Sequence, residues 1–412
     1  MRLLQVLPSV VRRDGNGELE VDTDFVEAQR VYLEEFDSVT VACPVAANVK
    51  GSGIVNCRPV KDLPWRRDRL NFLELPTAYG PRDFIHHYFT ARQVLRREIE
   101  CADYLTVSPH TLIGDWPTVA VREAIRLGRS YVLEADVVYE TLATLELKGK
   151  PIWKRAVKQY ILLPLFRRSY HYCLRNSSVC FFQGGDVYNA YAGFCPNPHN
   201  ILYHLPVYAG SHISDDELQK KLRNIHNRPL RICYAGRAID MKGPIDWLDT
   251  IDELLKCGVA LQATWFGDGP LLPSLRKEAA ARGISEHVRF PGFVTDQKEV
   301  LQAIKESDIF LFCHKTRESA RVLGEALACG CPLIGYGGSY PSELITTHGG
   351  GLFAGLGDWD QLAEYIQELD RNRSNLCNLI RNAALSGREI DRDAAMRRKI
   401  ALIKKYAGPA TT

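Results

Sequence analysis

The sequence predicts an α/β protein made of two doubly wound domains with parallel sheets. Short β-rich apolar runs alternate with segments of helical periodicity along the chain, a pattern typical of parallel strands joined by crossover helices. The pattern occurs once in each half of the sequence, and the 412 residues exceed the roughly 250–300 that one core usually serves. We therefore expect two domains facing each other across a cleft, with ligands at the carboxyl ends of the strands.

In the first half the pattern predicts five strands and four helices. The strands are expected at 2–7, 38–43, 104–108, 131–136 and 178–183. The helices are expected at 24–36, 81–102, 116–128 and 186–192. Asp24 is a good cap for the first helix, and Pro81 and Pro117 suit first helical turns because proline needs no hydrogen-bond donor there.

The second half repeats the scheme after a hinge. Strands are expected at 231–236, 261–267, 288–293, 308–314 and 332–336, with helices at 244–257, 270–282, 296–306, 320–329 and 358–370. Proline residues and a polar acidic patch mark a linker between the halves. The predicted domains are 1–205 and 206–390, with ligands bound by each. A last segment, 391–412, has the periodicity of a helix and is expected to return toward the first domain.

Composition excludes several classes of protein. The 52 Lys and Arg residues nearly balance 49 Asp and Glu residues, so nucleic acid is not an expected partner. The twelve cysteines form no CxxC pair, and no ligand set has the spacing of a metal site, so we expect free thiols and no metal. The first ten residues resemble a buried strand more than a signal peptide, which predicts a cytoplasmic protein.

A loop after strand 231–236 carries two cations at the start of a helix. Gly236 and Arg237 are followed by Lys242 and Gly243, directly before Pro244. Two cations beside the positive end of a helix suit a diphosphate. The alternative is that both are ordinary solvated charges on a βα loop.

Two further segments add candidates. Gly267 lies in a Gly-Asp-Gly-Pro turn at a strand end, where a close backbone approach or a plain turn is expected. Glu318 and Glu325 are seven residues apart, which would put both carboxylates on one face of a helix, where they can bind vicinal hydroxyls. Alternatively, Glu318 favours the helix dipole and Glu325 pairs with Arg321.

The order of these motifs over residues 229–370 resembles the nucleotide-binding domain of GT-B glycosyltransferases, specifically the retaining family 4. The resemblance implies a GT-B fold with two Rossmann-like domains. It also implies that Arg237 and Lys242 neutralise a donor diphosphate, that Glu325 holds the ribose and that Glu318 lies by the donor sugar. Gly236, Gly243, Gly267, Val294 and Leu323 complete the implied donor site.

The two glutamates depart from the family pattern by one residue. Six residues separate Glu318 from Glu325, whereas the family usually has seven. A loop deletion keeps Glu318 as the first glutamate, whereas an ungapped count would place Arg317 there.

The first half offers fewer candidates. Gly15 and Gly17 lie where the family has a glycine-rich donor loop, but a plain exposed turn fits equally. Where family members often carry a histidine, this chain has Asp136 at a strand end, and its carboxylate suits an acceptor proton or a helix cap.

Residues 147–185 contain eight Lys or Arg and no Asp or Glu, interleaved with aromatic residues. Such a segment suits the anionic cytoplasmic face of a membrane, although an amphipathic helix packed on the sheet is the simpler alternative. The predicted surface comprises Trp153, Lys154, Arg155, Lys158, Arg167 and Arg168.

The resemblance implies a retaining glycosyltransferase of polysaccharide or glycoconjugate biosynthesis, and the cationic loop predicts that it needs neither a metal nor a cofactor. Its expected partners are a nucleoside-diphosphate sugar and a saccharide or lipid-linked saccharide acceptor, with peripheral membrane contact. A GT-B-shaped nucleotide-sugar epimerase and a non-catalytic binding scaffold are the alternatives.

Overall fold

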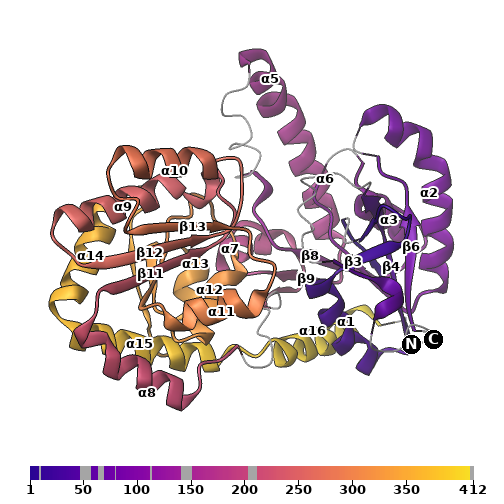
Figure 1. Ribbon diagram of the computed structural model, residues 1–412. Coiled ribbons are helices and arrows are strands. Elements are labelled where there is room, and N and C mark those ends of the chain that lie inside the picture. Colours follow the sequence, from indigo (N-terminus) through magenta and orange to yellow (C-terminus); the bar gives the residue numbers. More distant parts are fainter. Residues whose placement is uncertain are drawn as a thin grey trace. The chain divides into compact units, whose positions relative to one another are not determined.

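The computed structural model describes residues 1–8, 11–46, 57–63, 69–78, 80–111, 114–140, 151–202 and 211–408. The chain divides into two compact units, shown in Figure 1. Unit 1 comprises Met1–Tyr203 and Asp393–Thr412, and unit 2 comprises His204–Arg392.

Unit 1 contains a ten-stranded sheet in the order β10-β9-β8-β7-β1-β4-β2-β3-β5, with β6 also paired to β4. The strands that form its parallel part are β1 (Arg2–Val6), β4 (Ser38–Ala46), β6 (Leu70–Leu75), β7 (Tyr104–Val107), β8 (Val132–Ala135), β9 (Val179–Phe182) and β10 (Pro198–Asn200). The short strands β2 (Val11–Arg13), β3 (Leu19–Asp22) and β5 (Cys57–Pro59) extend it, β3 running antiparallel to both neighbours.

Helices surround this sheet. They are α1 (Thr23–Glu35), α2 (Pro81–Cys101), α3 (Trp116–Arg126), α5 (Ile152–Val157), α6 (Leu163–Arg175), α7 (Gly185–Tyr191) and α16 (Arg392–Ala407). A π-helical segment (Lys158–Leu162) joins α5 to α6, and single 3-10 turns occur at Val60–Asp62 and Ala192–Phe194.

Both faces of the unit 1 sheet are buried, because successive strand residues point to opposite cores. On β8, Leu133 and Ala135 belong to one apolar cluster and Val132 to the other. The second cluster also contains Met396 and Ile400, so α16 covers that face of the sheet.

Unit 2 contains a six-stranded, fully parallel sheet in the order β13-β12-β11-β14-β15-β16. Its strands are β11 (Leu230–Ala235), β12 (Leu261–Phe266), β13 (Val288–Gly292), β14 (Ile309–Phe312), β15 (Leu333–Tyr336) and β16 (Gly351–Ala354). Its helices are α8 (Asp215–Asn224), α9 (Pro244–Lys256), α10 (Leu272–Ala281), α11 (Gln297–Glu306), α12 (Arg321–Ala328), α13 (Ser339–Leu344), α14 (Trp359–Arg371) and α15 (Arg373–Arg388), with 3-10 turns at Ile225–Asn227 and Asp240–Lys242.

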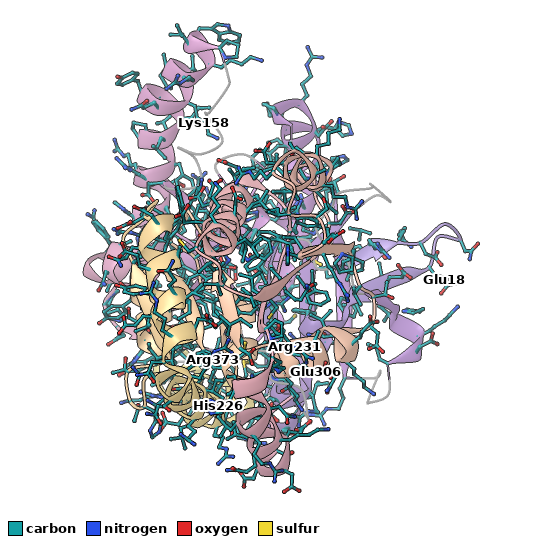
Figure 2. All side chains as sticks on the ribbon, turned by 60° about the vertical axis from the view of Figure 1, so that its left-hand side comes forward. Glu18, Lys158, His226, Arg231, Glu306 and Arg373 are labelled. Atoms are coloured by element: carbon teal, nitrogen blue, oxygen red, sulfur yellow. The ribbon has the colours of Figure 1, made fainter. Side chains whose placement is uncertain are left out.

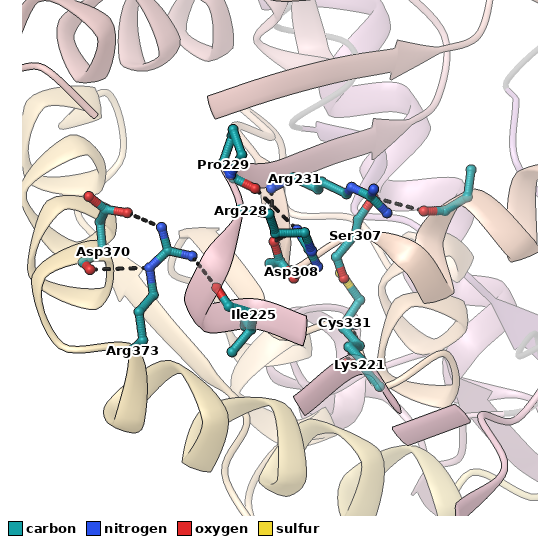
Figure 3. A network of polar contacts seen from close by, with 12 residues as sticks. Lys221, Ile225, Arg228, Pro229, Arg231, Ser307, Asp308, Cys331, Asp370 and Arg373 are labelled. Atoms are coloured by element: carbon teal, nitrogen blue, oxygen red, sulfur yellow. Dashed lines mark hydrogen bonds and ion pairs between the residues drawn. The ribbon is translucent and has the colours of Figure 1, made fainter. Parts of the chain in front are cut away.

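At the amino edge of the unit 2 sheet, a polar network holds the entry into β11 (Figure 3). Arg228 makes two hydrogen bonds of 2.7 Å to the buried carboxylate of Asp308, which precedes β14. Arg373 donates to the carbonyl of Ile225 at 3.0 Å. Bidentate Arg–carboxylate pairs fix geometry as well as charge. We therefore assign this network a structural role at the start of β11.

The predicted α/β class with two parallel sheets is confirmed, and a strand or helix lies within every range predicted above. The prediction missed the extension formed by β2, β3 and β5, whose three- and four-residue strands are too short to show a period. It also missed β6, β10 and β16.

Candidate functional site

The loops at the carboxyl edge of the unit 2 sheet are tied to one another by backbone hydrogen bonds. Gly236 N donates to the carbonyl of Phe266 at 2.8 Å, and Gly267 N donates to the carbonyl of Gly292 at 2.8 Å. Ala238 N donates to the carbonyl of Asp268 at 2.9 Å. The loops after β11, β12 and β13 therefore form one connected rim.

Two glycines in this rim have no room for a side chain. Gly243 has the left-handed φ of +61°, and a Cβ there would lie 2.0 Å from the carbonyl oxygen of Cys313. Gly267 has a φ of +126°, and its Cβ would lie 2.1 Å from the carbonyl oxygen of Gly236. Only glycine allows these close approaches, which place the loop before α9 directly against the end of β14.

Lys242 and Glu318 meet at this edge. Lys242 Nζ donates to Glu318 Oε1 at 2.6 Å, and the two side chains are 15% and 17% exposed. The residues are 76 positions apart in sequence, and the parallel topology brings together the loops that carry them. Both side chains keep some exposure to solvent, so a charged ligand can reach the pair.

The imidazole ring of His314 lies beside the Glu318 carboxylate. Its Nδ1 lies 3.5 Å from Glu318 Oε1, and its Nε2 lies 2.8 Å from the hydroxyl of Tyr234. Burial, with the Lys242 charge adding to it, holds the pKa of His314 well below its usual value, so the ring is neutral. The carboxylate beside Nδ1 favours the tautomer with its proton on that nitrogen, which leaves Nε2 to accept a hydrogen bond from the Tyr234 hydroxyl.

Arg237 differs from Lys242 in its surroundings. Its side chain is exposed, and within the described part of the chain no carboxylate forms an ion pair with it. The N-terminus of α9 follows at Pro244, after the turn that Gly243 makes. The arrangement places two cations and a helix N-terminus on one loop, which suits a diphosphate.

The remaining donor candidates lie around the same edge. Gln297 Nε2 donates to Glu325 Oε1 at 3.3 Å, so the partly buried Glu325 carboxylate is oriented from α11. Val294 is partly exposed in the loop after β13. The Leu323 side chain is only 1% exposed, so it packs in the core, and any ligand contact there must use the backbone.

The expectation that Glu318 and Glu325 lie on one helical face is wrong. Helix α12 begins at Arg321, and Ala320 before it has an extended backbone with a ψ of 110°. Glu318 therefore lies in the preceding loop, where Lys242 and His314 hold it, and only Glu325 is on the helix.

Sequence reasoning missed a second polar group at this edge. Lys315 Nζ lies 2.6 Å from Asp246 Oδ1, and the Tyr336 hydroxyl donates to Asp246 Oδ2 at 2.7 Å. The backbone N–H of Lys315 donates to the carbonyl of Met241 at 2.8 Å, which ties the loop after β14 to the cationic loop. The signal was the adjacent His314 and Lys315 after the apolar strand 309–312, polar residues at a strand's carboxyl end.

In unit 1, Asp136 follows β8 at the carboxyl edge of its sheet, with an exposed side chain. Surrounding protein nevertheless desolvates the carboxyl and raises its pKa; Glu134 adds to the rise and His110 opposes it. The neighbouring Glu134 has a different role, because it forms a buried ion pair with Lys399 of α16 at 2.8 Å.

Gly15 and Gly17 lie in the turn of the hairpin between β2 and β3, and both are exposed. Asp14 Oδ1 accepts from the N–H groups of Asn16 and Glu18 at 2.9 and 2.8 Å, so the turn is self-contained. Figure 2 shows Glu18 at the outer end of this hairpin. A contact of this turn with a ligand stays a prediction.

The six residues predicted to face a membrane lie on the helix that α5, the π segment and α6 form. Trp153 is 65% exposed, and Lys154 lies over its ring at 5.2 Å. Figure 2 shows Lys158 on the part of the helix that projects from unit 1. Arg167 is placed differently, because its Nε lies 3.4 Å from Glu140.

Across the described residues, no helix is both long and apolar enough to cross a bilayer. In the same part of the chain, no three His, Cys, Asp or Glu side chains are grouped as a metal site.

Comparison with known proteins finds similarity mainly in the second unit. Residues 215–386 match the family model described as Glycosyl transferases group 1. The amylovoran biosynthesis glycosyltransferase AmsK of Erwinia amylovora is 27% identical over 174 residues, which cover 41% of this chain and 42% of AmsK. The GDP-mannose-dependent alpha-(1-6)-phosphatidylinositol monomannoside mannosyltransferase of Mycolicibacterium smegmatis is 25% identical over 287 residues, 63% of this chain and 73% of that protein. The match with AmsK therefore spans less than half the length of that protein.

Solved structures match over nearly the whole chain. Anabaena Alr3699/HepE in complex with UDP has a TM-score of 0.68 at 14% identity and covers 98% of this chain and 100% of its own. WaaG, a glycosyltransferase involved in lipopolysaccharide biosynthesis, has a TM-score of 0.66 at 13% identity and covers 97% and 99%. These likenesses show that the chain has the GT-B fold.

Proposed function

We propose that this chain is a retaining, metal-independent glycosyltransferase that moves a sugar from a nucleoside-diphosphate sugar to a saccharide or lipid-linked saccharide. The observation that carries the proposal is the pairing of Lys242 with Glu318 on the rim of unit 2. That pair lies within residues 215–386, the segment that matches the glycosyltransferase model.

The chemistry of the rim suits a leaving diphosphate. Lys242 exchanges its carboxylate partner for phosphate oxygens when a donor binds, and Arg237 adds a second, planar cation. The N-terminus of α9 contributes the positive end of its dipole. Preorganised positive groups of this kind stabilise charge that develops on a leaving group, which is the task a metal ion has in other transferases.

Glu318 and Glu325 then serve the sugars of the donor. Once Lys242 turns to the diphosphate, the Glu318 carboxylate is free to accept hydrogen bonds from the hydroxyls of the transferred sugar. His314 keeps that carboxylate in place, since the ring stays neutral. Glu325, oriented by Gln297, is proposed to hold the ribose, and the loop at Val294 to receive the base.

Asp136 is the proposed carboxylate on the acceptor side. Its raised pKa brings it nearer to neutral pH, where a carboxylate takes up an acceptor proton more readily. Names of relatives support a glycoconjugate acceptor: one acts on phosphatidylinositol monomannoside, and another belongs to amylovoran biosynthesis.

The test is a transfer assay with labelled UDP-, GDP- and ADP-sugars, with saccharides and bacterial lipid extracts as acceptors. We expect release of one nucleoside diphosphate together with a labelled glycoside, equally with and without EDTA. NMR of the product should show that the anomeric configuration of the donor is kept. Lys242→Met should abolish transfer, whereas the exposed Lys277→Met on α10 should not.

Other products would contradict the proposal. A new nucleotide sugar without free nucleoside diphosphate would indicate an epimerase. Nucleotide binding without any product from any acceptor would indicate a binding scaffold, and loss of activity in EDTA that added Mg²⁺ restores would refute metal independence.

A further inference from the structure

Unit 1 exposes large apolar side chains on two separate helical elements. The first is the continuous helical segment 152–175, in which Ile152 is 84%, Tyr160 75% and Trp153 65% exposed. The second is the beginning of α2, where Ile85 is 70% and Phe89 is 68% exposed. Apolar side chains this large gather on a surface mainly where something else covers them.

The apolar residues of the first element recur at helical spacing. Trp153, Val157, Tyr160, Ile161 and Leu165 are all exposed. Steps of four, three, one and four residues keep them on one broad stripe of a helix. The segment is about 36 Å long at about 1.5 Å per residue, and its buried residues, Tyr170, Cys173 and Leu174, all lie near its end. The first half of the segment thus stands clear of the core of unit 1 (Figure 1).

The same segment is strongly cationic. Residues 151–175 contain six Lys or Arg and no Asp or Glu. Lys154 and Lys158 lie one helical turn apart, among these apolar residues. An apolar stripe bordered by cations lies well at the boundary between lipid headgroups and acyl chains.

The beginning of α2 and the projecting end of the segment 152–175 both lie at the carboxyl edge of the unit 1 sheet. Helix α2 begins six residues after β6, which is parallel to β4, so its first turns lie at the carboxyl edge. Helix α6 ends at Arg175, before the start of β9, so the opposite end of the segment 152–175 extends beyond that same edge. Ile85 and Phe89 are one turn apart and therefore share a face of α2.

We propose that unit 1 docks on an anionic lipid bilayer through these two elements, the stripe of the segment 152–175 and the pair Ile85 and Phe89. Charge decides for a bilayer over a second copy of the chain. A dimer through the segment would bring together two surfaces that carry only positive charges, whereas an anionic leaflet attracts those charges.

The reason for docking rests on the proposed function, but the association with the bilayer does not. Asp136 lies at the carboxyl edge of the same sheet, so docking would present that edge to a lipid-linked acceptor. The physical association itself needs no turnover and is measured without a donor.

The experiment is co-sedimentation of the full chain with phosphatidylcholine vesicles, with and without phosphatidylglycerol. We expect binding to the anionic vesicles that weakens as salt rises. Lys154→Gln and Lys158→Gln should each weaken it about fivefold. Trp153→Ser with Tyr160→Ser, and separately Ile85→Ser with Phe89→Ser, should each weaken it at least about tenfold.

Matched variants in unit 2 control for the substitutions. Leu356 and Leu385 are 68% and 42% exposed, and changing both to Ser should leave vesicle binding unchanged. Lys277→Gln is the control for charge. All variants should keep the wild-type melting temperature and nucleotide affinity, which separates the docking surface from the donor site.

Three results would overturn the proposal. One is equal recovery with neutral and anionic vesicles, and another is vesicle binding that the unit 1 variants do not weaken. The third is concentration-dependent dimerisation that Trp153→Ser with Tyr160→Ser abolishes. Vesicle binding without any transferase activity would leave the docking intact and refute the proposed function.

Discussion

The ion pair between Lys399 and Glu134 offers a direct test of how α16 is held on unit 1. Lys399 Nζ lies 2.8 Å from Glu134 Oε2, and the side chains are only 3% and 11% exposed. Lys399 also lies 5.8 Å from the ring centres of Tyr32 and Phe181. Lys399→Met keeps most of the side-chain volume but removes the charge, so the buried carboxylate of Glu134 loses its counter-ion.

The expected cost follows from burial. Removing one partner of a buried ion pair costs about 3–5 kcal/mol, because the other charge is left uncompensated. We expect the lower end, about 3 kcal/mol, since methionine preserves the apolar packing. At about 2–4 °C per kcal/mol for a unit of this size, the melting temperature of unit 1 should fall by roughly 6–12 °C.

The assay is urea unfolding and thermal melting of the full chain at neutral pH, and two further variants give the comparison. Glu134→Gln combined with Lys399→Met should recover much of the loss, because no charge is then buried alone. Lys404→Met breaks a more exposed pair with Glu35 and should cost less than about 1 kcal/mol. A Lys399→Met variant as stable as Lys404→Met would show that the Glu134 carboxylate does not depend on Lys399.

Three further predictions concern the two candidate edges. Because of His314, the free energy of unfolding should fall by up to about 1.4 kcal/mol for each pH unit below pH 6.5. The ring takes up a proton in the unfolded chain but stays neutral when it is buried. In urea titrations at several pH values, His314→Gln should remove this part of the pH dependence. Gly243→Ala should destabilise unit 2 clearly more than Gly258→Ala in thermal melts, since both have positive φ but only the first meets backbone, and equal losses would contradict the close approach. Asp136→Asn should slow transfer strongly while nucleotide affinity measured by calorimetry stays the same, and unchanged turnover would remove Asp136 from the reaction.

Much of unit 2 could be predicted from the sequence because its signals are local. Gly243 and Gly267 stand in turns at strand ends, where the pattern itself demands glycine. Lys242 shortly precedes a helix that begins with proline, so its position near a helix N-terminus can be predicted from the sequence.

The parts of the site that could not be predicted depend on contacts between residues that are far apart in the sequence. The seven-residue spacing predicts that Glu318 and Glu325 share one face of a helix, yet the backbone at Ala320 is extended and the helix starts later. The partner of Glu318 is Lys242, 76 residues away, which only the strand order of the sheet brings close. Lys399 and Glu134 are joined in the same way, because α16 packs on the sheet of unit 1.

The proposed function requires that the carboxyl edge of unit 2 binds a nucleoside diphosphate through Lys242. Calorimetric titration with UDP, GDP and ADP tests it most directly, on the wild type, on Lys242→Met and on Lys277→Met as the control. We expect one nucleotide to bind the wild type and the control equally, and Lys242→Met to bind it about 10–150-fold more weakly. Equal affinity for that nucleotide in Lys242→Met, or no binding of any of the three to the wild type, would contradict it.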